Sequence, residues 1–229
     1  MSRYLQATAA IAADALLPSD PGLAMRLAQE LTGSPRMSNH SHGLWGYFGR
    51  TAGGDELTVQ STGIGGPSAA AILGELAGLG VRRAVRVGTA VALDPAAVGT
   101  TVVVREAICD DGASRAFGAG ARVGADPTLS RALATAAGVR PSLIASCDVE
   151  PEPQSSHSER LRGDGAVAAD LETAALLAAA RAAGLALAAL VVACSPGAPA
   201  PEQLERSLVE LGRLGVGALA RTEPAADVG

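Results

Sequence analysis

Aromatic side chains are scarce in this sequence: they make up 2% of the 229 residues, whereas 48% of the residues are hydrophobic. We therefore expect the core to be built from Ala, Val and Leu. Cysteine is scarce as well, and Cys109, Cys147 and Cys194 are odd in number, widely spaced and without a CxxC pair. This pattern predicts neither a disulfide framework nor a zinc site, and it favours thiols that fill small core positions in a reducing compartment.

The sequence also lacks basic runs, a secretory leader and long apolar stretches. A net charge of -5 without a basic cluster argues against nucleic acid as a partner. Residues 1–6 are polar with no cleavage pattern after them, and the longest apolar run, residues 185–194, is too short to span a bilayer. The three histidines show no ligand spacing, so no metal is expected. We predict a cytoplasmic protein with one α/β domain over residues 1–229 and no membrane partner.

Predicted strands alternate with predicted helices along the chain, which indicates a mostly parallel sheet covered on both faces. The expected strands are residues 11–17, 57–62, 84–93, 98–107, 142–147, 166–169 and 185–195. The expected helices begin at residue 21, with Asp20 as cap, and cover residues 68–79, 127–137, 171–183 and 201–221.

Three other stretches do not fit a regular element. Residues 32–41 are polar and rich in turn residues, which predicts a loop, and residues 148–165 are Pro/Ser/Glu-rich, which predicts an irregular, mobile flap. Residues 43–49 hold three of the five aromatic residues. They form either a hairpin on the edge of the core or a loop that covers a pocket or a subunit contact.

Residues 56–93 are the stretch around which the chain is organised. A strand runs into Gly63, Gly65 and Gly66, a helix begins at Pro67, and the next strand carries Arg86 within an apolar segment. Exposed amides of such a glycine bend, at the carboxyl end of a strand, favour an anion. The unit predicts a ligand the size of a phosphate or carboxylate, although a plain tight connection and a structural role for Arg86 fit the same pattern.

Five motifs, in this order along the chain, resemble those of the purine nucleoside/uridine phosphorylase family, and most closely their uridine phosphorylase form. They are Pro18-Ser-Asp-Pro21, Ser61-Thr-Gly-Ile-Gly-Gly-Pro-Ser68, Val85-Arg-Val-Gly-Thr89, Asp111-Gly-Ala-Ser114 and Asp170-Leu-Glu-Thr-Ala-Ala-Leu-Leu177. The resemblance implies a three-layer α/β sandwich with a mixed, mostly parallel, partly barrel-like central sheet. It also implies homo-oligomers, as dimers or as hexamers built from three dimers, in which a neighbouring subunit helps to close each site.

The chemistry implied by this resemblance is cleavage of a ribosyl C–N bond, with inorganic phosphate as co-substrate and no cofactor. Glu172 matches the glutamate that holds the ribose 2′- and 3′-hydroxyls, and a carboxylate suits this task because it accepts two hydroxyl hydrogen bonds. Leu171 lies where an apolar residue supports the sugar. Arg86 and Thr89 match the phosphate-binding pair, with Thr89 also near the ribose, and Gly65 lies in the loop behind them.

The sequence departs from the family pattern around the phosphate. Leu23 stands where the family has an arginine after Asp-Pro, and Arg26 follows one helical turn later, facing either the site or solvent. His42 aligns with a second family arginine, which the neighbouring subunit contributes to the phosphate site. Histidine binds an anion more weakly than arginine at neutral pH, because it is shorter and only partly charged. Ser19 replaces a glycine. We therefore expect weakened phosphate binding.

The expected base pocket is altered too. An ungapped count places Glu150 at a family phenylalanine, Gln154 at the uracil-binding glutamine and Ser156 at its arginine, and we assign Glu150, Gln154 and Asp170 to the base. Arg160 and His157 lie close enough in sequence to compensate.

The leaving base gives a further contrast with purine enzymes. These protonate the base with an aspartate after the last strand, where this chain has Pro196. The sequence thus predicts a nucleoside phosphorylase for a uridine-like substrate. The alternatives are a nucleoside hydrolase of the same fold and a nucleoside-binding homologue without activity.

Overall fold

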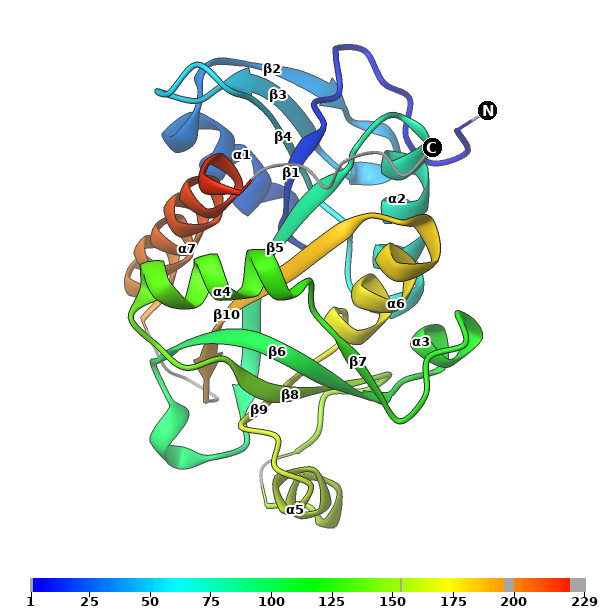
Figure 1. Ribbon diagram of the computed structural model, residues 1–229, viewed down its shortest axis with the longest axis vertical. Coiled ribbons are helices and arrows are strands. Elements are labelled where there is room, and N and C mark those ends of the chain that lie inside the picture. The colour runs from blue at the N-terminus through cyan, green and yellow to red at the C-terminus, as the bar shows by residue number, and fades with distance from the viewer. Residues whose placement is uncertain (1, 153, 196–199, 223–229) are drawn as a thin grey trace.

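The computed structural model (Figure 1) describes residues 2–152, 154–195 and 200–222. The strands are β1 (Asp14–Leu17), β2 (Gly33–Asn39), β3 (Gly46–Arg50), β4 (Glu56–Gln60), β5 (Arg83–Ala92), β6 (Thr101–Asp110), β7 (Arg122–Gly124), β8 (Ser142–Cys147), β9 (Ala168–Asp170) and β10 (Ala186–Cys194). The α-helices are α1 (Pro21–Leu31), α2 (Gly66–Gly78), α3 (Gly112–Ala116), α4 (Pro127–Ala137), α5 (Ser156–Gly163), α6 (Thr173–Ala183) and α7 (Pro201–Arg221). Two 3-10 turns are η1 (Ser41–Gly43) and η2 (Pro95–Ala97).

All strands belong to one ten-stranded sheet, part of which closes into a barrel. The strands follow the order β10-β6-β8-β9-β5-β1-β4-β3-β2, with β7 on β6. The ring β10-β6-β8-β9-β5 closes because β10 also pairs along its whole length with β5. This confirms the predicted mixed, partly barrel-like sheet. Parallel and antiparallel pairs are equally frequent among the described strands, so the sheet is less parallel than expected.

Helices cover both faces of the sheet and form the outer layers of a three-layer sandwich (Figure 1). Helices α1, α4 and α7 pack together on one face, over a core of Leu and Val side chains. Helices α2, α3 and α6 pack on the other face, where α6 contributes a run of fully buried Ala and Leu residues. Small side chains let these helices approach the sheet closely, so the scarcity of aromatic residues is compatible with a dense core.

Local signals in the sequence fix several helix ends as predicted. The Asp20 carboxylate caps α1 by accepting a hydrogen bond from the N–H of Leu23, and Asp126 caps α4 in the same way. Gly138 and Gly184 follow α4 and α6 in the left-handed conformation that glycine adopts without strain. Consequently the predicted bounds of α4 agree with the structure, and so do those of α7, which begins at Pro201.

The prediction of a loop over residues 32–41 is wrong, because this segment forms β2 and pairs antiparallel with β3. The turn-forming residues are tolerated since β2 is the last strand of the sheet and its register is broken between Gly33 and Arg36, around Pro35. The aromatic stretch forms β3, so Tyr47 and Phe48 lie buried in a hairpin on the edge of the sheet.

The prediction of an irregular flap over residues 148–165 is also wrong in part, because α5 occupies its second half (Figure 1). The Ser155 hydroxyl caps this helix, and Leu161 is fully buried against the end of the barrel. Tertiary packing of one leucine thus stabilises a helix whose sequence is polar and weakly periodic.

One carboxylate on α2 binds residues 2–5 of the N-terminal segment. Glu75 accepts hydrogen bonds from the Ser2 hydroxyl and from the backbone N–H groups of Arg3, Tyr4 and Leu5. Burial by itself would raise the pKa of Glu75, but these donors outweigh it and lower that pKa to about 2.

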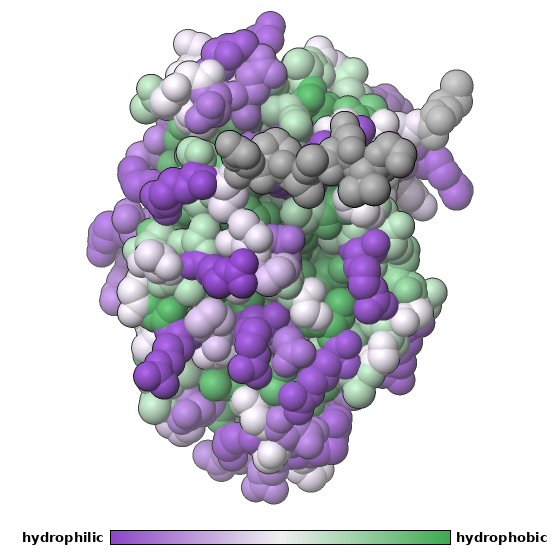
Figure 2. Space-filling model, in the orientation of Figure 1, coloured by the Kyte–Doolittle hydropathy of each residue, from purple (hydrophilic) through white to green (hydrophobic). Residues whose placement is uncertain are grey.

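The surface combines charged and apolar side chains. Figure 2 shows polar residues spread over one face, with smaller apolar areas between them. The most exposed large apolar side chain is Ile64, at 80% exposure in the glycine loop. Among the described helices, none is long and apolar enough to cross a membrane.

Candidate active site

A pocket of about 220 Å³ lies where β5, β9 and β10 end and the loop after β1 passes. It brings together most of the residues predicted for the site, namely Ser19, Arg86, Thr89, Glu150, Asp170, Leu171 and Glu172. Cys194 and Ser195 close the side formed by β10. Residues from distant motifs therefore meet in one pocket, as the resemblance implied.

The centre of the pocket is a buried group of one cation and two carboxylates. The Arg86 side chain is 3% exposed, and its Nη2 lies 2.5 Å from Glu172 Oε2 and 3.0 Å from Asp170 Oδ2. Burial by itself would lower the pKa of Arg86, but attraction to Asp170 and Glu172 outweighs it and raises that pKa. The guanidinium therefore stays charged, with both carboxyl groups in contact with the same nitrogen.

The other terminal nitrogen of Arg86 is free for a ligand. Arg86 Nη1 is buried and has no hydrogen-bond partner among the described residues. The guanidinium folds back over Gly88, where a Cβ would lie only 2.7 Å from Nη1. A buried cationic N–H without an acceptor is costly, so this nitrogen indicates a binding position for an anionic oxygen.

The glycine loop approaches the same carboxylate from the other side. The N–H of Gly65 donates to Glu172 Oε1 at 3.0 Å, and Gly65 itself has a φ of 87°, which favours glycine. The loop is fastened to the chain after β1, because the N–H of Gly63 donates to the carbonyl of Ser19 at 3.1 Å. Glu172 thus bridges Arg86 and the loop by direct contact.

Asp170 is occupied by groups of the protein. Its carboxylate accepts from the Ser146 hydroxyl at 2.5 Å, from the Thr173 hydroxyl and from the N–H of Thr173 at 3.2 Å, besides its contact with Arg86. These bonds fix the start of α6 and orient the guanidinium. Asp170 therefore contacts Arg86, which sequence reasoning missed although the acid stands only two residues before Glu172, and its assignment to the base stays a prediction.

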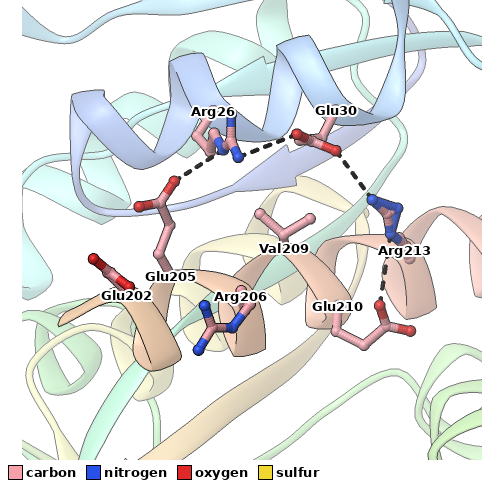
Figure 3. A pocket seen from close by; sticks show the side chains of 8 residues that line it. All are labelled: Arg26, Glu30, Glu202, Glu205, Arg206, Val209, Glu210 and Arg213. Atoms are coloured by element: carbon pink, nitrogen blue, oxygen red, sulfur yellow. Dashed lines mark hydrogen bonds and ion pairs between the residues drawn. The ribbon is translucent and has the colours of Figure 1, made fainter. Parts of the chain in front are cut away.

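Several of the predicted residues are not part of the pocket lining, among them Gln154, His42 and Arg26. Gln154 is exposed and has a φ of 65°, and His42 is exposed on η1, with its ring edge-on to Tyr4 at 5.6 Å between centroids. Arg26 lies on the surface, where it contacts Glu30 and Glu205 between α1 and α7 (Figure 3). Arg26 therefore does not supply a second phosphate contact within its own chain.

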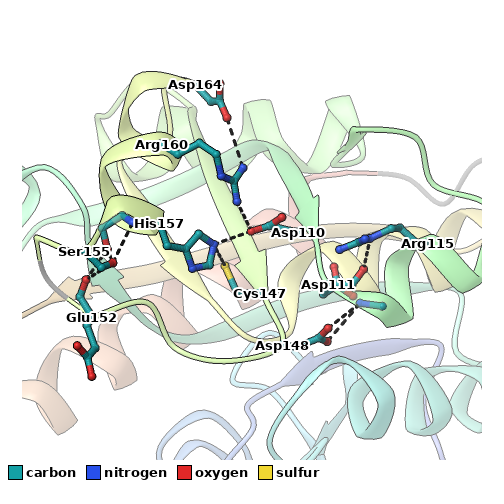
Figure 4. A network of polar contacts seen from close by, with 12 residues as sticks. Asp110, Asp111, Arg115, Cys147, Asp148, Glu152, Ser155, His157, Arg160 and Asp164 are labelled. Atoms are coloured by element: carbon teal, nitrogen blue, oxygen red, sulfur yellow. Dashed lines mark hydrogen bonds and ion pairs between the residues drawn. The ribbon is translucent and has the colours of Figure 1, made fainter.

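The residues expected to compensate at the base edge contact an acid instead. His157 Nε2 and Arg160 Nη2 each lie 2.6 Å from Asp110 Oδ2, and the Cys147 sulfur lies 3.9 Å from the same histidine nitrogen (Figure 4). Burial, together with the negative charges of Asp110 and Asp170, raises the pKa of Cys147 to about 12. The thiol is therefore neutral and no nucleophile. Ser156 begins α5, and Pro196 lies outside the described residues.

Comparisons with known proteins show which family the chain resembles. The profile of the phosphorylase superfamily matches residues 14–215. The chain is 38% identical over 104 residues to a uridine phosphorylase of Haemophilus influenzae, an alignment that covers 45% of this chain and 40% of that protein. It is 36% identical over 105 residues to a DeoD-type purine nucleoside phosphorylase of Oceanobacillus iheyensis, covering 45% and 42%, respectively. A uridine phosphorylase of Escherichia coli K12 is 34% identical over 104 residues, again covering 45% and 40%. The alignments thus span about two fifths of these curated relatives.

Proposed function

The chain belongs to the phosphorylase superfamily, and from this premise we propose that it cleaves the ribosyl C–N bond of a nucleoside with inorganic phosphate. The products are the free base and ribose 1-phosphate, and the reaction uses no cofactor. The observation that carries the proposal is the buried Arg86, whose Nη1 lacks a partner among the described residues and lies beside Glu172. A fixed cation and a carboxylate in one pocket match the two halves of this substrate pair, an anion and a polyhydroxyl sugar.

In the proposed complex, a phosphate oxygen accepts from Arg86 and from the Thr89 hydroxyl. The ribose 2′- and 3′-hydroxyls donate to Glu172, whose negative charge also favours the cationic, oxocarbenium-like transition state. Phosphate oxygen forms the new bond to the anomeric carbon, while the C–N bond breaks and its electron pair, later joined by a proton, leaves with the base. Leu171 supports the sugar and Ser19 lines the phosphate end.

Sugar hydroxyls that bind Glu172 compete with its contact to Arg86 Nη2, whereas Arg86 Nη1 stays available to phosphate. The contact between Arg86 and Glu172 is 2.5 Å long and almost fully buried. Breaking it therefore costs a charge-assisted hydrogen bond of about 1.5–3 kcal/mol, unless Arg86 and Glu172 both gain new hydrogen bonds. Phosphate supplies an acceptor for Arg86 only, and the ribose supplies donors for Glu172 only. The geometry therefore favours joint binding of the two substrates over binding of either one alone. Once Glu172 turns to the ribose, the N–H of Gly65 can donate a hydrogen bond to the phosphate.

We propose a pyrimidine base of the uridine type. Uridine phosphorylases are among the similar proteins, and Glu150, which lines the pocket, offers an acceptor for a ring N–H. The similarity to a purine enzyme makes inosine the necessary comparison.

We also propose that the working form is a homo-oligomer, a dimer or three dimers in a hexamer. His42 is exposed and lies outside its own pocket, so it could reach phosphate only in a neighbouring subunit. Analytical ultracentrifugation tests the assembly. His42→Ala then raises the KM for phosphate with little change for the nucleoside, whereas a monomer, or an unchanged KM, would remove this role.

The decisive experiment measures base release from uridine, thymidine, inosine and adenosine with and without phosphate, and identifies the sugar product. Phosphate-dependent release with ribose 1-phosphate supports the proposal, and Glu172→Ala should then lower kcat/KM by about 10³-fold or more, the loss of two charge-assisted bonds. Free ribose without phosphate would identify a hydrolase. Binding of nucleosides by calorimetry without turnover of any of them would identify a binding protein and refute the catalytic assignment.

A further inference from the structure

A second group of ligand-forming side chains gathers where β6 and β8 end beneath α5. Asp110 ends β6, Cys147 ends β8 and His157 lies in the first turn of α5. One carboxylate oxygen, the thiol sulfur and one imidazole nitrogen lie within 4.8 Å of one another. Figure 4 shows the three side chains pointing toward one another. Cys147 is fully buried, and the other two side chains are partly exposed.

The arrangement does not fit a catalytic relay. In a relay, histidine uses one ring nitrogen for the acid and the other for the nucleophile. Here the same atom, His157 Nε2, lies 2.6 Å from Asp110 Oδ2 and 3.9 Å from Cys147 Sγ. The three donor atoms therefore converge on one point, as the ligands of a single ion do.

We propose that Asp110, Cys147 and His157 bind a divalent cation of the zinc type. The combination of thiolate, imidazole and carboxylate suits zinc, whose bonds to these ligands are about 2.0–2.3 Å long, so that its ligand atoms lie roughly 3.3–3.6 Å apart. The sulfur–nitrogen distance would shorten by about 0.3 Å, and the carboxylate would move about 0.7 Å away from the imidazole. On binding, the sulfur–metal bond forms as the thiol proton passes to solvent.

Acidic residues surround the place where the cation would enter. The pocket beside the three ligands measures about 420 Å³, and Asp148, Glu150 and Glu152 also line it. These three carboxylates and that of Asp110 attract a cation, and the described residues of the lining include no arginine. The open side leaves room for water as a fourth ligand.

Arg160 is the group that opposes the proposal. Its Nη2 lies 2.6 Å from the same Asp110 oxygen, so it neutralises a charge that the cation needs. Because half of the Arg160 side chain is exposed, it can turn to solvent at low cost. If Asp110, His157 and Arg160 form only an ion-pair network, removing Arg160 weakens the fold. If they form a cation site, removing it strengthens binding.

The bound cation would fasten α5 to the ends of two barrel strands. It would also act near the other pocket, because Glu150 lines both. At a hundredfold excess over Kd, a ligand specific for the folded state should raise the Tm by roughly 5–10 °C for a chain of this size.

The test is titration of the chelator-treated full chain with Zn²⁺ by calorimetry, with thermal melts and with Co²⁺ absorption as a report of thiolate ligation. We expect one ion per chain, a raised Tm and a cobalt–thiolate band. Cys147→Ser and His157→Gln should each weaken binding by at least about a hundredfold, whereas the matched controls Cys109→Ser and His40→Gln should leave it unchanged. Arg160→Gln should tighten it by about fivefold.

Two results would overturn the proposal. The first is the absence of stoichiometric Zn²⁺ binding, or binding that survives in both Cys147→Ser and His157→Gln. The second is an Arg160→Gln variant with a lower Tm and unchanged Zn²⁺ affinity, which would leave an ion-pair network alone. Melts without metal show whether each variant is folded, and Asp110→Asn replaces any that is not. None of these readouts depends on phosphorylase activity.

Discussion

Replacing Gly88 by alanine tests whether the position of Arg86 controls anion binding. The backbone at Gly88 suits any residue, but the new methyl group would lie 2.7 Å from Arg86 Nη1 and 3.2 Å from Cζ. The guanidinium must move, and its contacts at 2.5 Å with Glu172 and 3.0 Å with Asp170 cannot both follow. We expect overpacking to cost about 1–3 kcal/mol of stability, a fall in Tm of roughly 3–10 °C.

The functional loss should exceed the loss of stability. A displacement of about 1 Å in a group that positions a reactant can cost about 10²-fold in rate. Gly88→Ala should therefore lower kcat/KM for phosphate about 10²-fold at a temperature where the variant is fully folded. Calorimetry with phosphate and a nucleoside present gives a second readout, in which phosphate affinity falls by a similar factor.

Gly74→Ala is the matched control, because Gly74 lies in α2 with no atom within 4 Å of the added methyl group. It should leave activity unchanged and stabilise the protein by about 0.5–1 kcal/mol. In an Arg86→Gln background, Gly88→Ala should cause no further loss of phosphate affinity, since the group it displaces is gone. A Gly88→Ala variant with unchanged phosphate affinity and kcat/KM would refute the role assigned to Arg86.

Three further predictions concern the site and the fold. Glu172→Gln keeps the shape of the side chain and removes its charge, so kcat/KM should fall about 10²-fold in steady-state assays, whereas unchanged rates would contradict its contact with ribose. The lowered pKa of Glu75, about 2, means that its contribution to stability is complete above the ordinary pKa near 4.5 and is lost as pH falls toward 2. Glu75→Gln should therefore destabilise the folded protein by about 2 kcal/mol at neutral pH, a value that allows for solvent screening. Between pH 5 and pH 3, the Tm of the variant should fall less steeply than the Tm of the original protein. Parallel Tm profiles for the two proteins would contradict this. Gly212→Val adds a side chain where even a Cβ would lie 2.6 Å from Leu27, so the Tm should drop by about 5 °C or more. Gly217→Val, at a half-buried position of the same helix, should lower the Tm by less. Equal decreases in Tm would contradict close packing of α7 on α1.

The sequence predicted the elements whose signals are local. Helix α4 begins after Asp126 and ends before Gly138, and the capping residue and the glycine are both legible in the chain. The sequence could not reveal β2, whose serine and proline are compatible with a strand only because that strand ends up on the sheet edge. It could not reveal α5 either, since burial of Leu161 against the barrel is a contact with residues far away in sequence.

The residues of the proposed active site show the same division. Local motifs pointed to Glu172 and the glycine loop, which follow strand ends, and to Arg86, which is a cation within the apolar strand β5. Only the arrangement of the strands in the sheet decided which of these side chains touch. It places Asp170 against Arg86, and it leaves Arg26 on the surface beside Glu205.

By itself the sequence determined the alternation of strands and helices and the family, and it predicted Arg86, Glu172 and the glycine loop as site residues. The tertiary structure alone decided that Glu172 bridges Arg86 and Gly65, and that Asp110, Cys147 and His157 meet at one point. The physical reason is the pairing of β10 with both β5 and β6, which closes the barrel. This closure brings together strand ends that lie dozens of residues apart, and no local pattern encodes their contact.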